Sequence, residues 1–196
     1  MIHFVVNLAR VREHWKLKFG TDAVAKASIM QAESLRTQME QNWRDKESII
    51  LSSLKRITGL DTAGSFTAYV MPAELEIGHY LDEKNIEWGY PNLYENYSLI
   101  GIAHELIHCL THHFYTSLSD DDKWLFHSII YLSADEEIRF ILNGKDDYFT
   151  SPIIATYHER LLATAKRILP YWKEHIASPS GKDIYTLFRD LQEKNV

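Results

Sequence analysis

Hydrophobic and polar positions divide the 196-residue chain into an amphipathic N-terminal part and a more apolar remainder. Residues 1–20 begin apolar, become amphipathic and end at Gly20, a residue type that favours the position just after a helix. From Ala23 to about Ile57, apolar residues recur at helical spacing among Glu, Gln, Arg and Lys. The pattern predicts one or two long helices that pack by one face and leave their charges solvated.

Short segments with β-type patterns follow a glycine-containing break. Residues 66–72 are rich in β-formers and end at Pro72, so we expect a strand there, of the edge type that tolerates proline. Segments 76–81 and 86–89 flank a polar turn and predict a β-hairpin. A small mixed sheet is therefore expected, and a peptide could bind in extended form along its strand edges.

Two strongly apolar helices are predicted after the sheet. Residues 98–113 are apolar nearly all round, which is typical of a helix buried through the middle of a domain. The stretch from Lys123 to Leu142 is also mostly apolar, and Asn143-Gly144 is suited to end it. The acidic run that stops at Asp122 is explained by a helix N-terminus, which favours negative charge.

The C-terminal pattern and the length complete the predicted architecture. A further helix is expected over 151–170, with a proline in its first turn, and a short last helix over 183–191. The length suits one domain of the α+β class, mostly helical. We divide it into an N-terminal helical part (1–58), a core (64–170) and a C-terminal helical tail (171–196).

Composition narrows the compartment and the partners. The net charge of −6 argues against nucleic acid or an anionic membrane as the main partner. The single cysteine, Cys109, excludes an intramolecular disulfide framework and favours a reducing compartment. We interpret it as a small core hydrophobe. We find neither a signal-peptide pattern nor an apolar run of membrane-spanning length, so a cytoplasmic protein is expected.

The buried helix at 98–113 carries His104, Glu105 and His108 in the order H-E-x-x-H. Residues four apart on a helix have Cβ atoms about 5–6 Å apart, so both imidazoles can bind one cation. Glu105 points away from them but lies beside a metal-bound water, where it can act as a general base. Catalytic zinc fits this pattern, because it takes three protein ligands and leaves one position for water.

The sequence leaves several sources for a third ligand. A metzincin-type histidine would stand at position 114, which is Phe114. His112 and His113 lie too far along the helix axis to join easily, and we interpret them as solvated or supporting residues. The run Asp135-Glu136-Glu137 lies within the next apolar helix, where carboxylates are costly to bury unless paired or metal-bound. We therefore expect a glutamate of this helix to be the third ligand.

His-Glu-Leu-Ile-His at 104–108, followed by Ser-Ala-Asp-Glu-Glu-Ile-Arg at 133–139, resembles the zinc sites of gluzincin metallopeptidases, such as thermolysin-like enzymes and clostridial neurotoxin light chains. The resemblance implies a zincin-like fold, a zinc cofactor, and Glu137 as the third ligand, with Glu136 as the alternative. Thermolysin-like sequences place an Asp four residues after that ligand to orient the first histidine. Ile141 stands there, which leaves Asp135 or Glu136 for that role.

The same resemblance implies hydrolysis of peptide bonds in a peptide or protein substrate. Zinc would polarise the carbonyl, and Glu105 would pass a proton from the bound water to the leaving amine. Tyr157, His158 and Arg160 are candidates to stabilise the oxyanion, because gluzincins often use Tyr, His or Arg from a later segment, and we predict Tyr157 and His158 as catalytic. The alternative is a catalytically silent zincin-like domain that binds a peptide or protein partner; Glu105 favours the enzyme.

Overall fold

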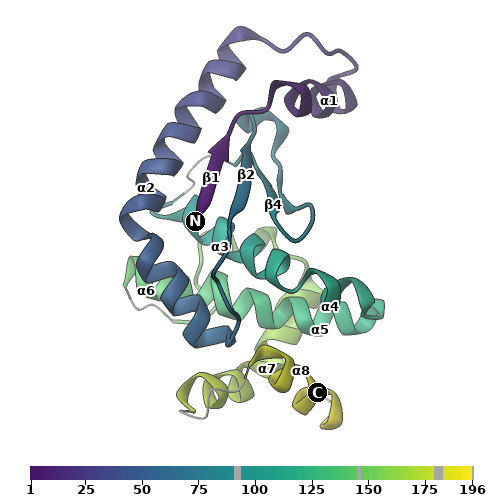
Figure 1. The fold of residues 1–196 in the computed structure, drawn as a ribbon. Helices are drawn as coiled ribbons and strands as arrows, with labels where there is room; N and C mark the ends of the chain where they lie inside the picture. The colour runs from purple at the N-terminus through teal and green to yellow at the C-terminus, as the bar shows by residue number, and fades with distance from the viewer. Residues whose placement is uncertain (91–93, 145–146, 179–182, 196) are drawn as a thin grey trace.

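The structure, a computed structural model, describes residues 1–90, 94–144, 147–178 and 183–195. Helices surround a small sheet in an α+β arrangement, as Figure 1 shows. The strands are β1 (Ile2–Val5), β2 (Phe66–Val70), β3 (Gly78–Tyr80) and β4 (Asn85–Trp88), in the order β1-β2-β4-β3. β1 and β4 pair with β2 in parallel, and β3 pairs with β4 antiparallel. The predicted α+β class with a small mixed sheet is thus confirmed.

Helices make up most of the remaining structure. The longer ones are α1 (Leu8–Phe19), α2 (Lys26–Thr58), α3 (Tyr97–Leu110), α5 (Asp120–Tyr131), α7 (Glu159–Ala177) and α8 (Ile184–Glu193). Shorter ones are α4 (His112–Ser117), α6 (Arg139–Asn143) and the 3-10 turns Ala73–Leu75 and Ile154–Thr156. A π-helical segment, η2 (Leu132–Ile138), continues α5 into α6. In the described part of the chain, none of these helices is long and apolar enough to cross a membrane.

The sheet presents one face to the main core. Phe66, Ala68 and Val70 of β2 are buried, while the residues between them are partly exposed, as expected when alternate side chains of a strand point to opposite faces. α2 packs against β1 and β2, whereas α3 packs against β3 and β4 and also contacts α2 (Figure 1). The helix that carries the H-E-x-x-H motif is therefore held between the sheet and the other helices.

Several predicted element boundaries are confirmed by their caps. Gly20 follows α1 with φ 74°, a left-handed conformation that glycine adopts without steric cost. The Ser119 side chain accepts a hydrogen bond from the backbone N–H of Asp122 and caps α5, whose first turn contains the acidic run. Asp183 caps α8 in the same way through the N–H of Thr186. Local polar chemistry thus sets where these helices begin.

Two expectations about prolines are wrong. β2 lies inside the sheet rather than at its edge; it ends at Val70, so Pro72 removes no hydrogen bond from the ladder. The helix expected over 151–170 begins only at Glu159, and Pro170 lies within α7. A proline inside a helix costs about 3 kcal/mol, and the complete burial of Ile168 and Trp172 on either side offsets that cost. Tertiary packing therefore overrides the local signal.

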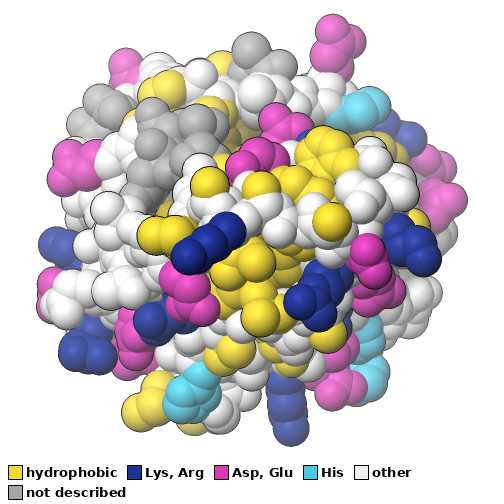
Figure 2. Space-filling model, turned by 90° about the horizontal axis from the view of Figure 1, so that it is seen from above, with side chains coloured by type: hydrophobic (Ala, Val, Ile, Leu, Met, Phe, Trp, Pro, Cys, Tyr) yellow, Lys and Arg dark blue, Asp and Glu magenta, His cyan; other side chains and the backbone are white. Residues whose placement is uncertain are grey.

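Apolar side chains also reach the surface at the α1 end of the molecule. Figure 2 shows hydrophobic side chains gathered there between charged ones. Leu17 and Phe19 of α1 and Met30 near the start of α2 are among the exposed apolar residues. Exposed apolar atoms are ordinary on folded proteins, so these residues need no further explanation.

Candidate metal centre

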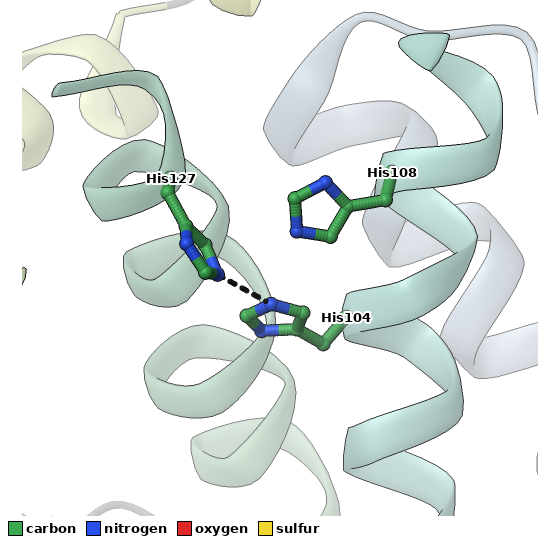
Figure 3. Close-up of side chains that lie close together, drawn as sticks. All are labelled: His104, His108 and His127. Carbon is green, nitrogen blue, oxygen red and sulfur yellow. Dashed lines mark hydrogen bonds between the residues drawn. The ribbon is translucent and has the colours of Figure 1, made fainter. Parts of the chain in front are cut away.

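Three histidines from two helices meet next to the sheet. His104 and His108 lie one turn apart on α3, and their ring centroids are 5.2 Å apart. His127 comes from α5, and its Nε2 lies 3.0 Å from Nε2 of His104. One nitrogen from each ring lies within 4.8 Å of the others, a group that could hold a metal ion. Figure 3 shows the three rings facing one another across the gap between the two helices.

His104 is oriented by a carboxylate of the π-helical segment. Nδ1 of His104 lies 2.5 Å from Oδ2 of Asp135, and both side chains are buried. The Tyr157 hydroxyl donates to the other Asp135 oxygen. With Nδ1 directed to Asp135, Nε2 of His104 faces the cluster, and a carboxylate on the other ring nitrogen is the usual arrangement of a metal-binding histidine. Of the two carboxylates that the sequence left open for this role, the structure places Asp135 there.

The electrostatics differ among the three imidazoles. Burial opposes the charged form of His104, but the Asp135 carboxylate outweighs it and raises the His104 pKa to about 9. Burial, together with the positive charge of His104, lowers the pKa of His127 to about 3 and that of His108 well below its ordinary value. His108 and His127 are therefore neutral near pH 7, as a metal ligand has to be.

His108 is enclosed on its outer side by aromatic rings. Tyr80 of β3 stacks on it with a centroid distance of 4.7 Å and an interplanar angle of 4°. Tyr115 of α4 meets it edge-on at 4.8 Å. Within the described residues, its buried Nδ1 has no hydrogen-bond partner. These rings fix the plane of the imidazole without a polar contact to Nδ1.

Glu105 lies on α3 between the histidines and the sheet. One of its oxygens, Oε2, accepts a hydrogen bond from the backbone N–H of Tyr80 at 2.8 Å. Burial raises the pKa of Glu105, although the nearby charge of His104 and the Tyr80 bond partly oppose this. A carboxylate with a raised pKa is suited to exchange protons near neutral pH.

A cavity of about 580 Å³ opens onto this group of residues. His104, Glu105, His127, Asp135 and Tyr157 form its polar lining. The remainder is mostly apolar or aromatic and consists of Leu75, Glu76, Gly78, Trp88, Tyr90, Tyr97, Gly101, Ile153 and Thr156. A concave space with convergent polar groups and an apolar or aromatic wall is typical of a ligand site.

The structure does not bring the predicted third ligand to the two histidines. The carboxylate of Glu137 accepts a hydrogen bond from the Tyr148 hydroxyl. Residues two apart on a helix do not face the same way, so Asp135 can contact His104 only while Glu137 points elsewhere. His127 is the residue that completes the group of potential ligands instead.

Glu136, the alternative ligand, has a structural environment of its own. It is fully buried, accepts a hydrogen bond from the Tyr131 hydroxyl at 2.5 Å and pairs with Arg139 at 2.7 Å. The backbone N–H of Phe149 donates to it as well. These partners satisfy a charge that would otherwise be costly to bury.

The two residues predicted from the later segment are placed differently. Tyr157 reaches the cavity and contacts Asp135. His158 instead caps α7 by accepting a hydrogen bond from the N–H of Arg160 at 3.1 Å, and its ring packs on Trp124. Whether Tyr157 stabilises an oxyanion stays a prediction, whereas His158 lies apart from the cavity lining.

Sequence reasoning missed His127. The signal was available, because a histidine in the apolar helix that follows an H-E-x-x-H helix is as suitable a ligand as a carboxylate there. His127 precedes Asp135 by eight residues in that helix, which is about two helical turns.

Comparison of the chain with protein-family models, curated proteins and solved structures gave no match.

Proposed function

We propose that this protein is a zinc-dependent metallopeptidase with a zincin-like site. His104, His108 and His127 would hold the metal, and Glu105 would act as the general base. One observation carries the proposal: three imidazole nitrogens lie within 4.8 Å of one another beside a cavity that Glu105 also lines. Three imidazole nitrogens with one open position are the typical donor set of catalytic zinc, and the metal would replace the proton that the raised pKa of His104 keeps on that ring.

The distance between two of the imidazole nitrogens is compatible with zinc. Two ligand atoms bound to tetrahedral zinc at about 2.0–2.1 Å lie roughly 3.3 Å from each other. Nε2 of His104 and Nε2 of His127 are 3.0 Å apart. Two imidazole nitrogens at this distance share either a proton or a cation, and zinc would displace the proton that the raised pKa of His104 places there. When bound, zinc would polarise a peptide carbonyl and lower the pKa of a water molecule.

Glu105 would take up the proton in this reaction. Its Oε2 is held by Tyr80, which leaves the second carboxylate oxygen to accept a proton and to deliver it to the leaving amine. The raised pKa of Glu105 favours both steps near neutral pH. Asp135 would keep His104 in the ligating tautomer, and Tyr157 would keep Asp135 in place.

Substitution of Glu105 separates catalysis from metal binding. Glu105→Gln is expected to keep zinc and to lose hydrolysis of a peptide library by at least about 100-fold, the lower range for general acid–base catalysis. His127→Ala should lose both zinc and hydrolysis, whereas His158→Ala, the matched histidine outside the cavity, should keep both. Equal turnover by wild type and Glu105→Gln would exclude the proposed base, whereas peptide binding without turnover by either protein would favour the silent, peptide-binding domain.

A further inference from the structure

A second group of potential metal ligands lies on the surface, away from the cavity. Glu83 comes from the turn between β3 and β4, and His112 and His113 begin α4. One ligand atom from each lies within 4.8 Å of the others. Nε2 of His113 is 2.9 Å from Oε1 of Glu83. We propose that these three residues form a second cation site, distinct from the buried histidine cluster.

The two elements that supply these ligands are fixed independently of any ion. Asp82 accepts hydrogen bonds from the backbone N–H groups of Lys84 and Asn85 at 2.8 and 3.0 Å, which holds the turn that carries Glu83. α4 follows directly on α3, and the His112 ring packs edge-on against Tyr80 at 5.8 Å. Ligands on fixed elements lose little conformational freedom when an ion binds.

His112 provides a second observation that points to a ligand. Its Nδ1 is buried and has no hydrogen-bond partner among the described residues. A buried polar atom without a partner costs free energy, and coordination of an ion by this nitrogen would remove the cost. Glu83, His112 and His113 also line one cavity of about 500 Å³, so water can complete the coordination of an ion there.

The donor set defines the class of cation. Two imidazoles and one carboxylate suit zinc, nickel, cobalt or copper, whereas magnesium and calcium prefer oxygen ligands only. The His113 and Glu83 side chains are 84% and 49% exposed, so the ion would exchange with solvent more easily than one in the buried cluster. The second site is therefore the weaker of the two.

An ion at this site would join the hairpin to the end of α3. β3 bears Tyr80, whose backbone N–H holds Glu105 and whose ring stacks on His108. Fixing the turn after β3 to the start of α4 would restrict movement of Tyr80 relative to α3. The second site would thus stabilise the wall of the cavity without contacting a substrate.

Zinc alone is the probe for the test. Equilibrium dialysis against excess zinc, followed by elemental analysis, should give two ions per wild-type chain and one per His113→Ala chain. Glu83→Gln should bind the second ion at least about tenfold more weakly, since even residues that only support a ligand contribute that much. His3→Ala, an exposed histidine outside both groups, is the matched control and should still bind two ions.

Two further arms separate this proposal from the proposed function. His104→Ala should lose the tighter ion only, and in this variant substoichiometric nickel should broaden the imidazole NMR signals of His112 and His113 before that of His3. Equal zinc content in wild type and His113→Ala, or equal broadening of all three signals, would overturn the second site and leave the buried centre unaffected. A single ion that is lost from His113→Ala but retained by His104→Ala would support the second site and overturn the first.

Discussion

Asp135→Asn tests the logic of the buried centre most directly, because it removes one charge and hardly changes volume. Asp135 contacts Nδ1 of His104 at 2.5 Å and raises the His104 pKa from 6.5 to about 9 against the effect of burial. At 1.36 kcal/mol for each pKa unit, the stabilisation of the charged imidazole is about 3 kcal/mol. With a neutral amide in place of the carboxylate, burial becomes the main effect on the imidazole, and we expect the pKa of His104 to fall below 6.5.

The same substitution should weaken metal binding at a pH above the wild-type His104 pKa of about 9, where loss of a competing proton does not offset the effect. Loss of a carboxylate that orients a ligating histidine typically costs 10–100-fold in affinity, which corresponds to about 1.4–2.7 kcal/mol. An NMR titration of His104 in the metal-free protein measures the first effect, and competition with a chromophoric zinc chelator measures the second. Tyr157→Phe, which removes only the hydrogen bond to Asp135, should lower the affinity less. An unchanged His104 pKa together with an unchanged zinc affinity would refute the assigned role of Asp135.

Three other substitutions test the choice of metal ligand, a close contact in the core and a buried carboxylate. His127→Ala should lose zinc while Glu137→Ala keeps it, and metal analysis showing the reverse would restore the glutamate as ligand. Gly101→Ala should lower the free energy of unfolding by about 1–3 kcal/mol, the usual cost of overpacking. The added Cβ would lie 1.8 Å from the Trp88 ring, which must then move. Urea denaturation measures the effect, and unaltered stability would contradict so close an approach. Glu87 is fully buried, and burial acts to raise its pKa. Hydrogen bonds from His79 and Arg10 outweigh burial and lower the Glu87 pKa from 4.5 to about 2. Glu87→Gln should therefore lower the free energy of unfolding by about 3 kcal/mol at pH 7. A depressed carboxyl pKa stabilises the fold above pH 4.5, and this contribution is lost as the pH falls toward 2, so a wild-type-to-variant difference that stays constant over that range would show that packing, not charge, is responsible.

The sequence predicted most clearly those features that depend on local chemistry. The helical spacing of His104 and His108 followed from a four-residue interval, and the hairpin followed from two short segments, 76–81 and 86–89, on either side of a polar turn. The burial of α3 followed from its apolar residues on every side. Each of these depends on neighbours in the chain, whose geometry the backbone period fixes.

Features that depend on how distant elements pack were not accessible in the same way. β1 pairs with β2 across more than sixty residues, and nothing in either segment specifies that partner. His127 becomes a potential ligand only because α5 lies beside α3 at the height of His104. The choice among Asp135, Glu136 and Glu137 depended on the rotation of a helix whose hydrogen-bond period was not known from the sequence.

The π-helical winding of residues 132–138 affects how the chain tolerates changes in length. Residues 132–138 are wound with wider turns than an α-helix, so the segment accommodates extra chain within a continuous rod. Removing one residue before Asp135, such as Ser133, would allow ordinary α-helical winding and a better set of local hydrogen bonds. Because the wide turn absorbs the extra residue, α6 could keep its position, but side chains within the segment would move, so that a different residue would face His104. The less regular winding therefore sets the register in which Asp135 meets the histidine, and a one-residue deletion here should do more harm to the site than to the helix.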